Sequence, residues 1–218
     1  MSQHNFAAMR SAMIASQLRT SGVNTPAVLA AFESVARERF VPDARATLAY
    51  ADSSIPLGGD RALNPTLTSA RLLNEAHILP TDHVLLIGAA TGYLAAVIAQ
   101  IAASIVAVDD RQDLLDIAAR ECAEAHAITW VNAPLSAGAS AQGPYDAILI
   151  DGAVEHIPDT IVDQLKPGGR LSTGLMERGV TRLATGRRSA GGFGITAFAE
   201  STCVALPGFS LPKVFTFA

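Results

Sequence analysis

The sequence of 218 residues predicts an α/β fold with a doubly wound, mostly parallel sheet. From residue 83 onward, short apolar segments typical of buried strands alternate with segments of helical periodicity. This alternation favours parallel strands that are joined by right-handed crossover helices. After Gly174 the helical segments stop and strand-like segments follow one another, which predicts an antiparallel edge on the parallel sheet.

The first third of the chain is predicted to be helical with a long loop. Residues 6–36 carry apolar side chains at helical spacing and are expected to form two helices that are separated at Gly22. Residues 40–66 contain several Pro and Gly residues, which predicts an irregular surface segment. Residues 68–76 are expected to form a further amphipathic helix.

The remaining elements are expected in regular succession. The predicted strands are residues 83–87, 105–108, 128–131, 145–150, 170–173, 180–185, 195–204 and 213–217, and the predicted helices between them are residues 92–101, 112–125 and 158–165.

Composition indicates a well-buried globular protein. Half of the residues are hydrophobic, 17% are charged and the net charge is −4, which argues against disorder and against a nucleic-acid-binding surface. The short basic stretches 37–39 and 187–188 are interpreted as solvated faces. No signal peptide is expected, and no apolar run approaches the ~20 residues of a membrane span. Cys122 and Cys203 are interpreted as buried free thiols of a reducing cytoplasm, and the five histidines lack metal-binding spacing.

The segment Val84–Tyr93 carries the main chemical signal. An apolar run ends in a turn that contains Gly88, Ala90 and Gly92, and a helical segment follows. In α/β folds, a strand, a tight turn and a helix N-terminus in this order form a site for an anionic or nucleotide ligand. The next predicted strand ends at Asp109, the position of a carboxylate that accepts both ribose hydroxyls.

The short chain and the antiparallel end of its sheet favour S-adenosylmethionine over NAD as the cofactor. An alternative interpretation is purely structural. In it, Gly88 and Gly92 only permit close packing of strand and helix, and Asp109 caps the helix that follows.

Several sequence blocks resemble one enzyme family over nearly the whole chain, from about Met13 to the C-terminal strands. The blocks are Ser34 to Pro42, Ala49 to Asp52 followed by Ile55 to Gly58, Leu85 to Tyr93, Tyr145 to Ile150, and Ile157 to Gly169. In these blocks the chain resembles the protein-L-isoaspartate O-methyltransferases.

This resemblance implies a Rossmann-like methyltransferase fold with a seven-stranded sheet, and S-adenosyl-L-methionine as the cofactor. It also implies transfer of a methyl group to the carboxylate of L-isoaspartyl residues in damaged proteins, with protein or peptide substrates in the cytoplasm. Residues 1–80 are expected to form N-terminal helices and a substrate loop, packed on a cofactor-binding core of residues 81–218 within a single domain. A carboxylate is already nucleophilic at neutral pH, so the reaction requires alignment and desolvation rather than a strong base.

The chain departs from the family in its substrate loop, Gly58 to Thr66. A serine that holds the substrate carboxylate in the family is replaced by Asn64 or, if the alignment is anchored on Pro65, by Leu63. The Asn64 amide is a candidate donor to a carboxylate, and Arg61 is a candidate bidentate partner. These two are the predicted catalytic residues. Arg61 is alternatively a solvent-facing loop cation, with Asp60 nearby to neutralise it.

Further departures fall in the cofactor motifs. Leu86 replaces an acid, and Ala133 stands where a carboxylate is expected near the adenine, so that Asn132 is either a partial substitute or a strand-end cap. Asp151 and His156 follow the fourth core strand and are candidates for a polar contact or a base, or else for a capping or surface role. The predicted cofactor-binding residues are Gly88, Ala90, Gly92, Tyr93, Asp109, Asn132 and Asp151, and no metal ligand is predicted.

These departures belong to one expected pocket and leave two alternatives to the family activity. One is a methyltransferase with a different acceptor. The other is a non-catalytic relative with weakened cofactor binding that holds a metabolite or a protein partner.

Overall fold

The structure is a computed structural model and describes residues 5–211. A seven-stranded sheet has the strand order β5-β4-β3-β6-β7-β8-β9. The first five of these strands are parallel, and β8 and β9 are antiparallel to their neighbours. The predicted doubly wound sheet with an antiparallel edge is therefore confirmed. The strand predicted at residues 213–217 lies outside the described residues. The strands of this sheet are β3 (His83–Ile87), β4 (Ser104–Asp109), β5 (Ile128–Asn132), β6 (Tyr145–Val154), β7 (Leu165–Glu177), β8 (Val180–Ser189) and β9 (Gly192–Glu200).

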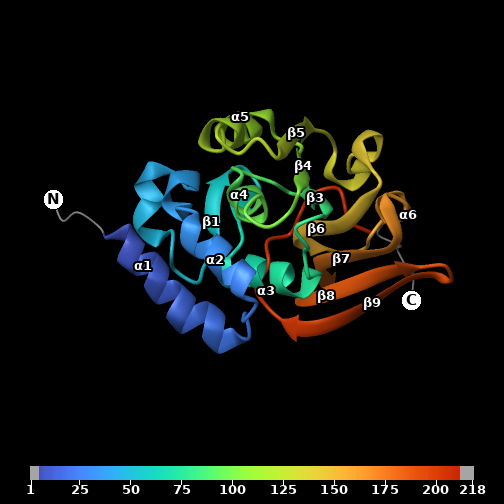
Figure 1. Cartoon of the computed structure of the whole chain (residues 1–218), viewed down its shortest axis with the longest axis horizontal. Helices are drawn as coiled ribbons and strands as arrows, with labels where there is room; N and C mark the ends of the chain where they lie inside the picture. Colours follow the sequence, from blue (N-terminus) through green and yellow to red (C-terminus); the bar gives the residue numbers. More distant parts are fainter. Residues whose placement is uncertain (1–4, 212–218) are drawn as a thin grey trace, which may run out of the picture.

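The N-terminal part is helical, as predicted. Gly22 has a φ of +89° and ends the first helical segment, and Thr25 precedes a helix that begins with Pro26. In Figure 1, α1 lies at the left of the view and the β8–β9 hairpin at the lower right. The helical elements before the sheet are α1 (Phe6–Met13), the π-helical η1 (Ile14–Leu18), the 3₁₀ turns η2 (Arg19–Ser21), η3 (Arg37–Phe40) and η4 (Asp43–Leu48), α2 (Pro26–Ser34) and α3 (Thr66–Ala76).

The segment 40–66 is more ordered than predicted. It contains the turn η4 and a separate two-stranded antiparallel hairpin of β1 (Ile55–Gly58) and β2 (Arg61–Leu63). The prediction of an irregular segment was wrong here because the tight Gly58–Gly59 turn lets the two short strands pair. This hairpin carries the loop that the sequence singled out.

Elements of the core differ from the prediction mainly in length. Strand β7 begins at Leu165, because residues 166–169 form an irregularity in the strand instead of ending a helix. The helices are shorter than expected, and the segment between β5 and β6 forms two 3₁₀ turns. These elements are α4 (Tyr93–Ile98), α5 (Gln112–Glu121), α6 (Asp159–Val162), η5 (Leu135–Ala137) and η6 (Ser140–Gln142).

Each face of the sheet is covered by its own apolar core. Val84 and Leu86 belong to the core beneath the N-terminal helices, whereas Leu85 and Ile87 belong to the core that includes Leu206. Side chains on a strand alternate between faces, so the run Val84–Ile87 serves both cores. Leu86 is completely buried and fills the first core. Within residues 5–211, no helix is long and apolar enough to cross a membrane.

Candidate functional site

The carboxyl ends of the parallel strands bring most of the predicted site residues to one edge of the sheet. The turn Gly88–Gly92 follows β3, and Asp109 ends β4 beside Asn132, which ends β5. Asp151 is the seventh of the ten residues of β6. Ligands of open α/β sheets bind at this edge, so the fold places these residues where a cofactor site is expected.

Asp109 is held in position by backbone donors. The Ala90 N–H donates to Oδ2 at 2.7 Å, and the Arg111 N–H donates to Oδ1 at 3.1 Å. Ala90 adopts a φ of +49°, a left-handed conformation that disfavours residues with a side chain. The bond to Arg111 does not cap α5, because Arg111 precedes that helix, which begins at Gln112. The bond to Ala90 ties Asp109 to the turn after β3.

Arg61 occupies both oxygens of the Asp109 carboxylate. Its Nη1 and Nη2 donate to Oδ1 and Oδ2 at 2.9 and 2.6 Å, and Nη1 also lies 2.6 Å from the Asp110 carboxylate. Arg61 is 2% exposed and Asp109 is fully buried. The interpretation of Arg61 as a solvent-facing cation is therefore wrong. Its carboxylate partners are Asp109 and Asp110 rather than the exposed Asp60, because the hairpin places β2 over the end of β4.

Leu206 covers the two glycines that border this edge. A Cβ atom on Gly88 would lie 3.1 Å from a methyl carbon of Leu206, and one on Gly152 would lie 2.3 Å from its Cγ. The Leu206 N–H donates to the Ala153 carbonyl at 3.0 Å, which fixes the segment beside β6. Gly88 and Gly152 thus give space to Leu206 in this structure. Gly92 similarly allows close approach of α5, since a Cβ there would lie 2.9 Å from that of Ala118.

These contacts decide whether S-adenosylmethionine fits the site. A ribose bound by Asp109 needs the two carboxylate oxygens that Arg61 already occupies. In the arrangement described here, Asp109 therefore cannot accept the ribose hydroxyls of the cofactor. Asp109 would accept them only with Arg61 displaced.

Asn64 is fully engaged within the protein. Its amide nitrogen donates to the carbonyl and to Oδ1 of Asp151 at 2.8 and 2.9 Å, and its Oδ1 accepts the Val204 N–H at 2.7 Å. Ser69 donates its hydroxyl to the same Asp151 oxygen at 2.8 Å. Burial raises the pKa of Asp151 above its ordinary value. Asn64 thus joins the substrate loop to β6 and to the segment after β9.

Arg37 is a buried charged residue of this region, so the interpretation of residues 37–39 as a solvated face was wrong for it. It is 1% exposed, and its Nη2 donates to the Asn64 carbonyl at 2.7 Å. Its guanidinium lies 4.6 Å from the centroid of the Tyr93 ring, a cation–π arrangement. Tyr93, predicted as a cofactor contact, packs its ring against Phe32 and Phe40. The short basic stretch gave no signal of this burial, because the ring that receives Arg37 is distant in the sequence.

Two other predicted candidates, Asn132 and His156, are less buried than Asp109. Asn132 is exposed at the end of β5, next to Asp109 in the sheet. His156 is half-buried, with Nδ1 2.8 Å from the Phe209 carbonyl oxygen. Cys122 and Cys203 are free thiols; Cys122 is buried and Cys203 is partly exposed. Within residues 5–211, no group of three or more His, Cys, Asp and Glu side chains is arranged to hold a metal ion.

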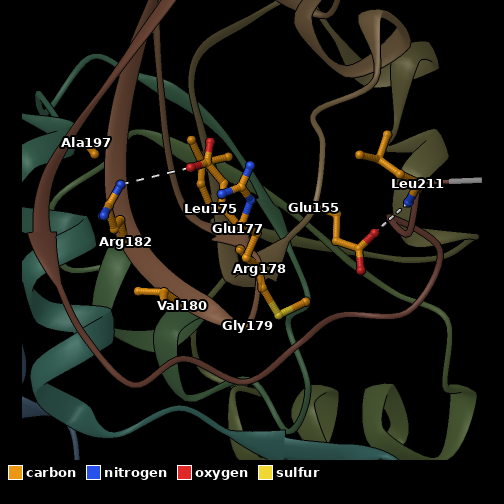
Figure 2. A pocket seen from close by; sticks show the side chains of 10 residues that line it. Glu155, Leu175, Glu177, Arg178, Gly179, Val180, Arg182, Ala197 and Leu211 are labelled. Atoms are coloured by element: carbon orange, nitrogen blue, oxygen red, sulfur yellow. Dashed lines mark hydrogen bonds and ion pairs between the residues drawn. The ribbon is translucent and has the colours of Figure 1, made fainter. Parts of the chain in front are cut away.

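A large cleft lies away from these residues. It has a volume of about 1160 Å³ and lies at the turn between β7 and β8, as Figure 2 shows. Glu155 borders it and accepts the Leu211 N–H at 2.7 Å. Among the described residues that line the cleft, none is a predicted catalytic or cofactor-binding residue.

Comparison with known proteins places the chain in a family. The model of the protein-L-isoaspartate(D-aspartate) O-methyltransferase family matches residues 9–207. The chain is 38% identical over 170 residues to a Picosynechococcus protein-L-isoaspartate O-methyltransferase, covering 75% of each chain. It is 37% identical over 172 residues to protein-L-isoaspartate O-methyltransferase 1 of Rhodopseudomonas palustris, covering 77% of this chain and 69% of the relative.

Solved structures share the fold. A protein-L-isoaspartate O-methyltransferase superimposes with a TM-score of 0.78 at 21% identity, covering 91% of this chain and 66% of that chain. A Plasmodium falciparum protein described as a beta-aspartate methyltransferase, solved in complex with S-adenosyl-L-homocysteine, also has a TM-score of 0.78, at 15% identity and covering 94% of this chain and 99% of that chain. The extent and level of the sequence matches establish that this chain belongs to the protein-L-isoaspartate O-methyltransferase family.

Proposed function

We propose that this chain transfers a methyl group from S-adenosyl-L-methionine to the carboxylate of L-isoaspartyl residues in damaged proteins of the cytoplasm. The observation that carries the proposal is the match of residues 9–207 to the family, together with identities of 37–38% to named members. The carboxylate of Asp109 at the end of β4, anchored by the Ala90 and Arg111 N–H groups, supports it.

The predicted residues divide between the two sides of the site. Asp109, the Gly88–Gly92 turn, Asn132 and Asp151 belong to residues 81–218, which we propose as the cofactor-binding core. Arg61 and Asn64 belong to residues 1–80, which we propose as the substrate side. When bound, S-adenosylmethionine supplies the methyl group on a positively charged sulfur. The chain has to orient the acceptor carboxylate and keep water from it, because an ionised carboxylate needs no further base.

Arg61 is the group best suited to orient that carboxylate once it is free of Asp109. Its planar guanidinium binds a carboxylate through two parallel hydrogen bonds, as it does with Asp109 in this structure. Asn64 has no such reserve, since its amide already bonds Asp151 and Val204. We therefore propose Arg61 as the substrate contact and Asn64 as the residue that positions the loop.

Transfer of labelled methyl groups from S-adenosylmethionine to an isoaspartyl peptide tests the proposal, with the matching aspartyl peptide as the control. Labelling of the isoaspartyl peptide alone is expected. The variant Asn64→Ser, which restores the family serine, is expected to raise this activity if Asn64 occupies the serine position. Equal labelling of both peptides, or of neither, would contradict isoaspartyl specificity.

The engagement of Arg61 and Asn64 favours a second candidate, a relative with weak cofactor binding that acts on another acceptor or does not catalyse transfer. Calorimetric titration with S-adenosylhomocysteine separates the candidates. No binding at millimolar concentration would exclude isoaspartyl methylation and methylation of another acceptor, and would leave the non-catalytic relative. Binding without methylation of the isoaspartyl peptide would favour a different acceptor.

A further inference from the structure

We propose that Arg61 is an internal occupant of the ribose position at Asp109 and that it sets how tightly this chain binds a nucleoside ligand. The inference rests on the proposed function, because it concerns the same cofactor site. It assigns to one loop residue the control of access to a carboxylate that lies 48 positions further along the chain.

The contact that Arg61 makes resembles the one a ribose would make. A vicinal diol donates two hydrogen bonds to the two oxygens of a carboxylate, and the guanidinium of Arg61 donates at 2.9 and 2.6 Å to the two oxygens of Asp109. The bonds from Arg61 join two oppositely charged groups, whereas ribose hydroxyls bring no charge of their own, so the contact with Arg61 is the stronger one. A nucleoside therefore cannot replace Arg61 at Asp109 without a net loss at this contact.

Asp109 does not depend on Arg61 for its orientation. The Ala90 and Arg111 N–H groups each donate to one of its oxygens, at 2.7 and 3.1 Å. Both donors belong to the backbone at the carboxyl end of the sheet. The removal of the Arg61 guanidinium would leave a carboxylate that is still aimed and still partly neutralised, which is the state a ribose requires.

The tip of the hairpin that carries Arg61 can move without breaking a hydrogen bond of the main sheet, while Ile55 and Leu63 at its base stay buried in the core beneath the N-terminal helices. Strands β1 and β2 pair only with each other in the structure of residues 5–211 and form no part of the seven-stranded sheet. The turn before Arg61 contains Gly58 and Gly59, with φ values of +101° and +61°, conformations that glycine adopts without strain. Besides Arg61, the tip is held by Arg111, whose Nη1 donates to the Gly58 carbonyl at 3.2 Å.

The proposal makes ligand affinity depend on the fraction of molecules with Arg61 displaced. The apparent dissociation constant equals the intrinsic one divided by the open fraction, so a closed resting state weakens binding in proportion. In a variant without the guanidinium, every molecule has Asp109 free, so the apparent dissociation constant falls to the intrinsic one. The variant therefore gains affinity, whereas the loss of an ordinary binding residue lowers affinity.

The test is calorimetric titration of S-adenosylhomocysteine into the full chain and its variants. Arg61→Ala is expected to bind at least about tenfold more tightly than the unaltered chain. Arg120→Ala is the matched control, because it removes the same charge from an exposed position on α5. Its affinity is expected to stay within about twofold. Equal or weaker binding by Arg61→Ala would overturn the proposal.

A second variant covers the case in which Arg61→Ala does not fold. Asp110→Asn weakens the 2.6 Å contact that helps to hold Arg61 and leaves Asp109 intact. It is expected to tighten binding by about threefold, and no gain would count against the proposal. Hydrogen exchange gives an independent readout: addition of S-adenosylhomocysteine to the unaltered chain should speed exchange at residues 58–63, and protection there would overturn the proposal.

The outcomes separate this inference from the proposed function. Tight binding and isoaspartyl methylation by the unaltered chain, with weaker binding by Arg61→Ala, would reject the role of Arg61 as an occupant of the ribose position and leave the proposed function standing. Tighter binding by Arg61→Ala without isoaspartyl methylation by any variant would support that role of Arg61 and reject the proposed function.

Discussion

The amide nitrogen of Asn64 lies 2.9 Å from a carboxylate oxygen of Asp151, while the Asn64 oxygen accepts the Val204 N–H at 2.7 Å. One buried side chain thereby satisfies polar groups on β6 and on the segment after β9. A buried polar group that loses its hydrogen-bond partner destabilises the fold by the full free energy of its desolvation.

Asn64→Ala is therefore expected to lower the free energy of unfolding by about 2 kcal/mol, because the Val204 N–H and Asp151 each lose a partner. Urea unfolding at neutral pH measures the change. Asn132→Ala is the control, since Asn132 is exposed and its substitution is expected to change stability by less than about 0.5 kcal/mol. A similar loss in both variants would show that the network around Asn64 contributes no stability of its own.

We expect the stability difference between the unaltered chain and the variant Asp151→Asn to depend on pH. Burial raises its folded-state pKa above the ordinary 3.8, so the folded state favours the protonated carboxyl. The resulting stabilisation is fully present below the unfolded-state pKa and is lost as the pH rises through the folded-state pKa. Asp151→Asn imitates the protonated form and still offers an acceptor to Asn64 and Ser69.

The variant Asp151→Asn is thus expected to melt at a higher temperature than the unaltered chain at pH 7–8, with the gap closing towards pH 4. Thermal unfolding of both proteins over this pH range measures the gap, and the acid end serves as the internal reference. A gap that is constant over the range, or that widens in acid, would show that the Asp151 pKa is not raised.

The contact between Leu206 and Gly152 predicts a paired mutational effect. A Cβ on Gly152 would lie 2.3 Å from the Leu206 Cγ, so Gly152→Ala is expected to cost about 1–3 kcal/mol through overpacking. Leu206→Ala makes room for the new methyl group. In a double-mutant cycle measured by urea unfolding, the double variant is expected to be more stable than the sum of the single effects indicates. Strict additivity would mean that the two side chains do not compete for this space.

Ala90 predicts a stabilising substitution. The left-handed conformation destabilises a folded chain by about 1–2 kcal/mol at a residue with a side chain, and glycine avoids this strain. Glycine in turn makes the unfolded state more flexible, which offsets about 0.5–1 kcal/mol of the stability gained. Ala90→Gly, at a φ of +49°, is therefore expected to gain about 0.5 kcal/mol. The neighbouring Ala89→Gly is the control and is expected to lose stability, because Ala89 is not among the residues with positive φ. Thermal unfolding compares the two, and a loss in both would contradict the prediction.

The central parallel strands were predictable because β3 and β4 are apolar runs that are buried on both faces. The run His83–Ile87 was placed at its observed bounds, and the parallel pairing of the strands followed from their alternation with helices. The errors lie where the chain breaks a regular pattern. Residues 166–169 look like the end of a helix, yet they continue β7 as an irregular strand.

The partners of the charged residues were not predictable in the same way. Arg61 and Asp109 form an ion pair across 48 positions, and Arg37 meets the ring of Tyr93 across a similar gap. Such pairs depend on how the hairpin and the N-terminal helices lie over the sheet, which no local periodicity encodes. The position of Asp109 was recoverable from its spacing, but the identity of the group that faces it was not.

The bond between Asn64 and Val204 joins residues that are 140 positions apart, which has a consequence for the order of folding. Contacts of such long sequence separation carry a high loop-closure cost and form after the local ones. During synthesis the parallel strands emerge before Val204 does. We therefore expect the substrate loop to be fixed in place only after translation has passed the final hairpin, so that the chain completes its sheet before it completes its site.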